Sequence, residues 1–385
     1  MATELTYVLI TPYTIQKSRT GGIIARLLSR TDLEFVGAKM IAPTEKFTND
    51  YATLLKETAS DEERDIKKIT VDYVKRSFAP YEKKYQRVMF LLFRGEDACR
   101  KIHDLAGKLC PGIRTGKTIR DTFSDYVLNS DGSVRYFEPA IIVPSSSKSA
   151  EKELKLFADY LSDEPNIIDK DLLFGENAKD KRTLVIIKPD NWRYPSSRPG
   201  NIIDMLSKTG LRILGCKLYR MSIEEALEFY GPVKDVLRDK LAPKIGEQAK
   251  AVLEKELKIR ISNENQKKLT ETVGLEFADD QFSMIVEFMA GIRPEDCPKE
   301  EYSKPGKAKC LILIYQGENA VEKIRAVLGP TDPSKAPGGT IRKDFGTDVM
   351  VNTAHASDSF ENAKREMGIV KIDKNSVVDV IRGNA

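Results

Sequence analysis

The sequence predicts an α+β protein built from two similar halves in tandem, and three observations support this prediction. An apolar run stopped by proline opens each half, at residues 7–12 and again at residues 184–189, which is the pattern of a buried strand that ends in a loop. After each run, strand-like and helix-like segments alternate in the same order. The length of 385 residues also favours two or three domains over one.

The elements that follow the opening strand can be matched between the halves. The matching pairs are residues 22–28 and 201–206 for an amphipathic helix, 35–39 and 213–217 for a second strand, and 88–93 and 311–315 for a third strand followed by a helix. A Thr-Ile-Arg tripeptide then recurs, at residues 118–120 and 340–342. This order is typical of a split βαβ, ferredoxin-like domain, an antiparallel sheet with helices on one face.

The matched segments also set the domain boundaries. We expect a first domain over residues 1–163, a linker over the polar stretch 164–181, and a second domain over residues 182–385 that ends in a C-terminal tail. The tail is expected either to pack on a neighbouring element or to fray. The second domain carries an insertion at about 233–280, charged and helical in pattern. It is interpreted as a solvated helical hairpin, with a lid or an oligomer contact as the alternative.

Composition argues against several functional classes. With 62 basic and 58 acidic residues, the net charge of +4 does not indicate a nucleic-acid or membrane-surface protein. No apolar run reaches the roughly 18 residues of a membrane span, and the N-terminus does not resemble a signal peptide. The five cysteines are odd in number and form no CxxC pair, so neither a zinc site nor a disulfide framework is predicted. This cysteine usage indicates a reducing compartment, and we expect a cytoplasmic location.

His355 is the strongest functional signal in the chain. It is one of only two histidines, and it lies in a polar stretch shortly after the second Thr-Ile-Arg tripeptide. Neutral imidazole is abundant at neutral pH and can act as a covalent nucleophile. The surroundings therefore favour phosphoryl transfer through a phosphohistidine over a histidine that only satisfies hydrogen bonds in a core.

The second domain resembles the nucleoside diphosphate kinase family. The matching pieces, in order, are residues 185–190, 228–230, 325–333, 337–346 and 352–359. The resemblance implies an enzyme that transfers the terminal phosphate of ATP, or of another nucleoside triphosphate, to a nucleoside diphosphate by a ping-pong route through His355. It also implies Mg²⁺, bound through the nucleotide phosphates, with no metal site made by the protein itself.

The same resemblance assigns roles to the matched side chains. Lys188 and Tyr230 would flank the phosphate in transfer, and Glu366 would hydrogen-bond the imidazole and fix which ring nitrogen attacks. The residues expected to hold the phosphates and the sugar are Arg325, Thr331, Arg342 and Asn352.

Two further expectations concern the base and the helix that carries the carboxylate. The base would be clamped between Val349 and Phe282, with Gln281 as the alternative to Phe282. Asp358 and Glu361 form a capping-box pattern at the start of the helix that contains Glu366.

The first domain is predicted to be catalytically silent. Thr11 stands where Lys188 stands, His103 falls near the position of Arg325, and the stretch 137–146 has an aliphatic residue where the nucleophile should be. We expect this domain to supply the partner surface of an intrachain pseudo-dimer, since family members self-associate. A decayed passenger domain is the alternative, and further homo-oligomerisation stays open.

A rival interpretation makes the whole chain a non-catalytic nucleotide-binding or scaffold protein on the same fold. Ala356, where the family usually has glycine, and the Pro- and Lys-rich insertion at 292–307 favour this rival. The complete set of matched residues in the second domain argues against it. In either case the expected partners are nucleoside di- and triphosphates, and not membranes or nucleic acids.

Overall fold

The structure, a computed structural model, describes residues 3–58, 64–111, 113–173 and 182–383. The chain forms two compact units, one made of Met1–Leu218 with Leu311–Ala385 and a smaller one made of Tyr219–Cys310. The predicted linker, residues 164–181, lies partly outside the described residues. Among the residues that are described, no helix is both long enough and apolar enough to cross a membrane.

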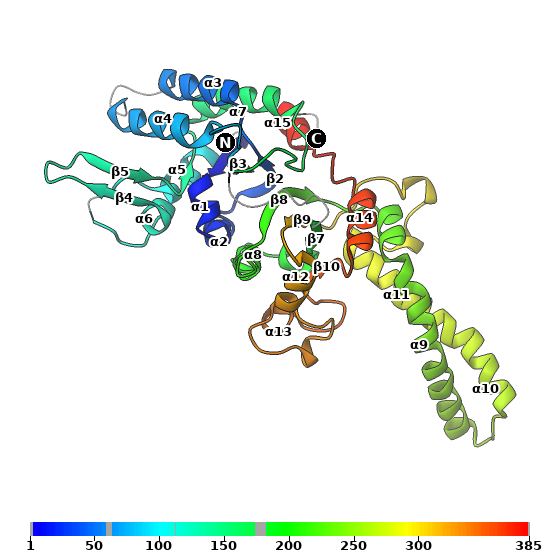
Figure 1. Cartoon of the computed structure of the whole chain (residues 1–385). Coiled ribbons are helices and arrows are strands. Elements are labelled where there is room, and N and C mark those ends of the chain that lie inside the picture. The colour runs from blue at the N-terminus through cyan, green and yellow to red at the C-terminus, as the bar shows by residue number, and fades with distance from the viewer. Residues whose placement is uncertain (1–2, 59–63, 112, 174–181, 384–385) are drawn as a thin grey trace. The chain divides into compact units, whose positions relative to one another are not determined.

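The first half of the larger unit contains a four-stranded sheet in the order β2-β3-β1-β6, with antiparallel pairings (Figure 1). Its strands are β1 (Thr3–Ile10), β2 (Glu34–Ile41), β3 (Val88–Glu96) and β6 (Ile141–Ile142), and a separate hairpin is formed by β4 (Asp125–Leu128) and β5 (Val134–Glu138). Its helices are α1 (Pro12–Gln16), α2 (Thr20–Arg30), α3 (Glu45–Glu57), α4 (Arg64–Phe78), α5 (Ala98–Ala106), α6 (Ile119–Phe123) and α7 (Ser147–Leu161).

The second half contains a sheet in the order β10-β7-β9-β8. Its strands are β7 (Arg182–Ile187), β8 (Arg212–Tyr219), β9 (Cys310–Gln316) and β10 (Ala354–Ala356), and its helices are α8 (Arg198–Ser207), α12 (Ala320–Leu328), α13 (Ile341–Phe345), α14 (Phe360–Ile369) and α15 (Val377–Arg382). Counted along the chain, both sheets have the spatial order 4-1-3-2. The predicted α+β, ferredoxin-like fold class is therefore confirmed.

The apolar runs that open the halves become the central strands β1 and β7. Ile10 and Ile187, the last residues of these strands, are fully buried, and a proline two residues later ends each strand. The core of the first half forms where α3, α4 and α7 cover its sheet, with Tyr7, Tyr51 and Phe157 among the buried side chains. Burial of these runs on the central strands explains why they are continuously apolar and do not alternate.

The two halves pack directly against each other through α2 and α8. A Cβ atom at Gly21 would come within 2.3 Å of the Gly200 carbonyl oxygen, and one at Gly200 within 2.3 Å of the Gly21 carbonyl oxygen. Only glycine allows helices to approach this closely. Asp204 adds a hydrogen bond across the same crossing, because its Oδ1 accepts from the Gly22 N–H at 3.1 Å.

The C-terminal tail packs on the first half. Helix α15 contacts α7 and β2, and Val377, at its start, is 1% exposed within the core of the first half. Of the two expectations for the tail, the structure supports packing on a neighbouring element.

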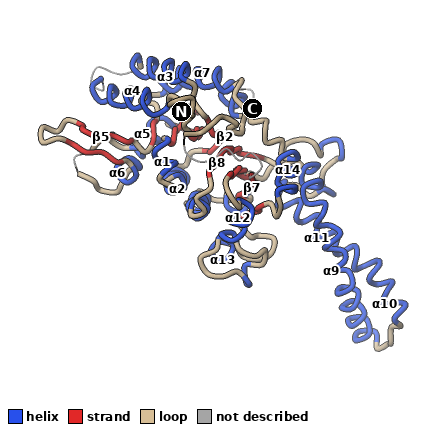
Figure 2. The backbone as a smooth tube through the Cα atoms, viewed as in Figure 1, coloured by secondary structure: helices blue, strands red, loops and turns tan. Residues whose placement is uncertain are grey.

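The smaller unit is almost entirely helical, as Figure 2 shows. It contains α9 (Ile223–Leu257), α10 (Asn263–Leu269), a π-helical turn (Thr270–Gly274) and α11 (Leu275–Ala290). Ser222 and Glu225 cap the start of α9 reciprocally. Gly246 and Gly274 let α9 and the π-helical turn approach closely, since a Cβ at Gly246 would meet the Thr270 hydroxyl at 2.1 Å. The predicted insertion, about 233–280, lies within this helical unit.

Candidate functional site

His355 lies in the short edge strand β10, where it pairs with Ile186 of β7. Its Nε2 is 3.0 Å from Glu366 Oε1, and its side chain is 22% exposed while that of Glu366 is 6% exposed. The second carboxylate oxygen of Glu366 accepts a hydrogen bond of 2.6 Å from the Ser357 hydroxyl. An ionised carboxylate only accepts, so this arrangement favours the tautomer that donates from Nε2 and keeps the lone pair on Nδ1.

Helix α14, which carries Glu366, begins at Phe360 and not at the predicted cap. Ser359 is the N-cap residue, with extended backbone and a hydroxyl that accepts from the Asn362 N–H at 3.0 Å. The predicted Asp358–Glu361 capping box is therefore wrong. The Asp358 carboxylate instead accepts from the Asn362 side chain at 2.6 Å, because it lies one position too early to reach the orphan N–H groups of the first turn.

Lys188 directly follows β7 and turns towards the loop before His355. Its Nζ donates to Asn352 Oδ1 at 2.7 Å and to the Met350 carbonyl at 3.4 Å. Burial, together with the nearby positive charge of Arg342, lowers the pKa of Lys188 to about 8. An ammonium buried in this way has little competing solvent, so its charge would act strongly on an anion bound beside it.

Thr353 is a functional-region residue that the sequence does not reveal. Its φ is +77°, which is unusual for a β-branched residue. Its carbonyl accepts from the Lys188 N–H at 2.9 Å and from the Asn191 side chain at 2.8 Å. Strained conformations of this kind cost about 1–3 kcal/mol and persist where the surrounding structure fixes them. Here the hydrogen bonds to the Thr353 carbonyl fix the turn that leads into β10.

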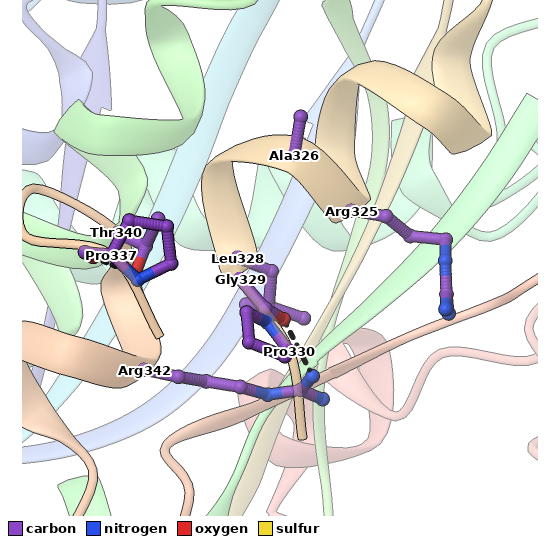
Figure 3. Close-up of a pocket in the computed structure, with 8 residues that line it drawn as sticks. All are labelled: Arg325, Ala326, Leu328, Gly329, Pro330, Pro337, Thr340 and Arg342. Carbon is purple, nitrogen blue, oxygen red and sulfur yellow. Dashed lines mark hydrogen bonds between the residues drawn. The ribbon is translucent and has the colours of Figure 1, made fainter. Parts of the chain in front are cut away.

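A cavity of about 340 Å³ lies at the C-terminal end of α12 (Figure 3). Arg325 and Arg342 both line it, together with Gly329 and Thr340. The Arg342 guanidinium donates to the Gly329 carbonyl at 2.9 Å and to the Ala354 carbonyl, next to His355, at 3.1 Å. Two guanidinium groups at one cavity suit an anion with several oxygens.

The remaining predicted residues of the larger unit lie around this site. Asn352 is buried, and its Nδ2 donates to the Thr331 carbonyl at 3.2 Å and to the Val349 carbonyl at 2.7 Å. Thr331 is exposed, and Val349 is 58% exposed, free to contact a planar ligand. The structure thus brings together the predicted residues Lys188, Arg342, Asn352, His355 and Glu366.

Tyr230 and Phe282 belong to the smaller unit, so their approach to His355 stays a prediction. Tyr230 is 8% exposed, and its ring centroid is 4.9 Å from that of Phe229. Phe282 is 4% exposed, and the Lys234 ammonium lies 5.5 Å from its ring centroid.

The first half places an aliphatic side chain where the second half has its histidine. Ile142 pairs with Leu9 in the register that joins His355 to Ile186. Thr11 takes the place of Lys188, with its hydroxyl donating to the Pro139 carbonyl at 2.7 Å.

Two other groups of the second site have counterparts in the first half. Arg120 donates to the Gly107 carbonyl at 2.7 Å and to the Ile141 carbonyl at 3.4 Å, as Arg342 does to its own two carbonyls. Glu153 is fully buried on α7 and accepts from the Tyr7 hydroxyl and, at 3.2 Å, from the Thr58 hydroxyl. The first half therefore keeps the arginine and the carboxylate of the site but has an isoleucine in place of the histidine.

Known proteins resemble this chain over about half of its length. A sequence model described as nucleoside diphosphate kinase matches residues 300–374. A nucleoside diphosphate kinase of Anaeromyxobacter dehalogenans is 56% identical over 187 residues, which are 49% of this chain and 86% of that protein. One of Dehalococcoides mccartyi is 54% identical over 189 residues, 49% of this chain and 90% of that protein.

Among solved structures, the nucleoside diphosphate kinase of Aquifex aeolicus matches 49% of this chain and 94% of its own, with 25% sequence identity and a TM-score of 0.30. An NDP kinase from Pyrobaculum aerophilum matches with the same coverage, identity and TM-score.

Proposed function

Because the chain belongs to the nucleoside diphosphate kinase family, we propose that it transfers the terminal phosphate of a nucleoside triphosphate to a nucleoside diphosphate through a phosphohistidine at His355. The predicted family and its enzyme class are confirmed by this membership. The observation that carries the proposed chemistry is the 3.0 Å contact between His355 Nε2 and Glu366 Oε1, which leaves Nδ1 as the nucleophile.

Each half-reaction is an in-line displacement at phosphorus. In the first, the Nδ1 lone pair bonds to the γ-phosphorus, the bond from that phosphorus to the bridging oxygen breaks, and the diphosphate leaves with the electron pair. In the second, a terminal oxygen of the acceptor diphosphate attacks the phosphohistidine, and the electron pair of the P–N bond returns to Nδ1. Glu366 holds the imidazole and stabilises the positive charge that it gains.

The cationic side chains would bind the polyphosphate. Arg325 and Arg342 line the cavity at the end of α12, and we assign them to phosphate oxygens, with Thr331 as a further donor. Lys188 would stabilise the phosphate in transfer as a point charge. Asn352 would contact the sugar hydroxyl and a phosphate.

Magnesium would enter with the nucleotide. Among the described residues there is no group of three or more His, Cys, Asp or Glu side chains placed to hold a metal ion, and the cavity is lined by arginines. These residues fit an anion and not a cation, so Mg²⁺ would be held by the phosphate oxygens. When bound there it supplies neutralisation of the charge on the β- and γ-phosphates.

We assign the nucleoside end of the substrate to residues that the resemblance to the family indicates, one of which is exposed. Val349 is exposed beside the site and would contact one face of the base. We propose that Tyr230 and Phe282 of the smaller unit complete the phosphate and base contacts.

The first half would act as an intrachain partner for the catalytic half. The close glycine crossing of α2 and α8 and the Gly22–Asp204 hydrogen bond support this assignment. The first half would in this way supply, within one chain, the partner surface that family members obtain by self-association.

The five cysteines are all free thiols, which is consistent with action in the reducing cytoplasm.

The proposal is tested by ATP-to-GDP phosphate exchange, with wild type, His355→Ala and His103→Ala compared side by side. His355→Ala is expected to lose exchange and to take up no acid-labile phosphate from ATP and Mg²⁺. His103→Ala removes the only other histidine, which is exposed on α5, and is expected to behave as wild type. Folded wild type that binds nucleotide without exchange would move the chain to the non-catalytic binding class.

A further inference from the structure

The placement of Glu366 depends on how the end of α14 is held. Glu366 lies three residues before the last residue of α14, Ile369, and its carbonyl accepts from the Val370 N–H at 3.1 Å as the helix ends. A shift of this last turn would move the carboxylate away from His355, because the side chain is buried and has little freedom to compensate.

A buried lysine of β8 holds the end of this helix. Lys217 Nζ donates to the Val370 carbonyl at 3.0 Å and to the Lys371 carbonyl at 3.1 Å. A cation at the C-terminus of a helix satisfies orphan carbonyls and interacts favourably with the helix dipole. The first half has the same device, since Lys39 of β2 donates to the Glu164 carbonyl, just past the end of α7, at 2.7 Å.

The segment after α14 then leaves the catalytic half and joins the first half. We call residues 370–377 the strap. The Ile372 carbonyl accepts from Asn166 Nδ2 at 2.8 Å. Asn375 Nδ2 donates to the Ala38 carbonyl of β2 at 2.9 Å, to Asn166 Oδ1 at 2.7 Å and to the Cys216 carbonyl of β8 at 3.2 Å.

Asn375 thus joins three segments at one point: a strand of the first half, the start of the linker region, and a strand of the second half. Its own Oδ1 accepts from the Val377 N–H at 3.1 Å, and Val377 is buried in the core of the first half. The end of the strap is therefore fixed by apolar burial and its middle by hydrogen bonds.

We infer that the strap, through Asn375, positions Glu366 against His355 and is the route by which the first half supports catalysis. Asn375 is a positioning residue in this scheme, since it acts through α14 and does not touch the substrate. The inference rests on the proposed phosphohistidine chemistry. The physical basis is a continuous chain of packed and hydrogen-bonded groups from the core of the first half to the catalytic carboxylate.

The test uses the full chain with Asn375→Ala, which removes the amide group that donates to Ala38, Asn166 and Cys216. The rate of His355 phosphorylation by ATP in a single turnover is expected to fall about 2- to 30-fold, the range of coupling through such networks. The KM for ATP is expected to stay unchanged, because the residues assigned to the phosphates lie outside the strap. A rate equal to that of wild type would overturn the inference.

The imidazole tautomer gives a second readout that does not require turnover. The chain has two histidines, so the ¹⁵N-labelled imidazole NMR spectrum contains two spin systems, and His103 serves as an internal reference. Wild type should show His355 protonated at Nε2, and Asn375→Ala should populate the other tautomer measurably. An unchanged tautomer would contradict the positioning role even in a chain that has no exchange activity, so failure of this inference and failure of the proposed function are distinguishable.

Two matched variants control for a general loss of stability. Arg382→Ala removes a surface contact of the same tail, with Ser162 at 2.9 Å, and is expected to leave both readouts as in wild type. Asn375→Asp keeps the acceptor for Val377 but removes the donated hydrogen bonds, so it should reproduce the effect of Asn375→Ala. Thermal unfolding of each variant verifies that the chain is folded. If Arg382→Ala changed the phosphorylation rate and the tautomer as much as Asn375→Ala does, the assignment to the strap would be overturned.

Discussion

The two halves of the larger unit have the same sheet topology, yet they differ in the side chains at the edge of the sheet. In the second half the edge strand carries His355, backed by Glu366, and Lys188 lies at the end of the neighbouring strand. In the first half the corresponding positions hold Ile142 and Thr11. The comparison separates the residues that build the frame, which both halves share, from the residues to which we assign the reaction, which only the second half has at these positions.

The frame includes a carboxylate on the helix that follows the edge strand of each half, Glu153 on α7 and Glu366 on α14, and the arginine of each Thr-Ile-Arg tripeptide. Glu153 in the first half is directed to the Tyr7 and Thr58 hydroxyls, and burial raises its pKa. Glu366 in the second half is directed to an imidazole. The same position in the fold therefore serves packing in one half and, in the proposed mechanism, catalysis in the other, and matched substitutions can measure the difference.

The largest contrast is expected from the two carboxylates. Glu366→Ala should lower the rate of phosphate exchange roughly 10- to 100-fold, as is typical when the group that orients a reacting side chain is removed. Glu153→Ala should leave the rate per folded molecule unchanged but lower the free energy of unfolding by about 3 kcal/mol, because buried hydroxyls lose their acceptor. Exchange assays and chemical denaturation measure the two effects. A folded Glu153→Ala protein with impaired exchange would break the comparison.

The next contrast is between the two arginines. Arg120→Met and Arg342→Met should each lower the free energy of unfolding by about 2 kcal/mol, since each guanidinium bridges two buried carbonyls. Only Arg342→Met should also weaken nucleotide binding, measured by calorimetry with ADP. Equal nucleotide affinity in wild type and Arg342→Met would mean that Arg342 is part of the frame alone.

Much of this comparison could be predicted from the sequence. Hydrophobic periodicity and proline placement predict the opening strands and the order of elements. Alignment of the two halves reveals the repeated tripeptide and the aliphatic residue that stands in place of His355. The sequence pattern indicates Asp358 as the cap of α14, one residue before the observed cap Ser359, which is the usual uncertainty at helix ends.

Other features depend on contacts that no local pattern encodes. Asn375 lies 337 residues from Ala38 in the chain, yet the two are hydrogen-bonded. The hydrogen bond from the Gly22 N–H of α2 to Asp204 likewise depends on the packing of two helices from different halves. The left-handed backbone of Thr353 contradicts the preference of its residue type, so only the tertiary structure reveals it.

A smaller contrast is expected in the pH dependence, because Lys188 titrates and Thr11 does not. The folded-state pKa of Lys188 is lowered from 10.5 to about 8 by burial, so the unfolded chain binds more protons between these values and stability contributed by this group rises with pH across that window. Affinity for ADP should move in the opposite direction and fall as pH rises through about 8, since the ammonium is lost. Calorimetric titrations from pH 7 to pH 9.5 measure this fall. A flat profile in wild type would show that ADP binding is not linked to the protonation of Lys188, which would contradict its assignment to the phosphate.

The smallest expected effect concerns the residue before each edge strand, where the halves differ in backbone conformation. Thr353 has a φ of +77°, whereas Ala140, whose carbonyl also accepts a hydrogen bond from the residue that follows the opening strand, has no positive φ. Thr353→Gly should raise the free energy of unfolding by about 1 kcal/mol, because glycine adopts positive φ without strain. Ala140→Gly should lower it by a similar amount, since glycine adds backbone entropy to the unfolded chain and the change removes a buried methyl group.

The opposite signs make this last pair a sharp test, because both changes introduce the same residue at matching places. Thermal unfolding monitored by circular dichroism distinguishes them, and destabilisation by both substitutions would mean that the Thr353 side chain contributes more than its strain removes. If Thr353→Gly stabilises the chain while slowing His355 phosphorylation, the strain holds the turn that carries Asn352 and the nucleophile in place. The catalytic half would then differ from the silent half in backbone geometry as well as in the identity of its side chains.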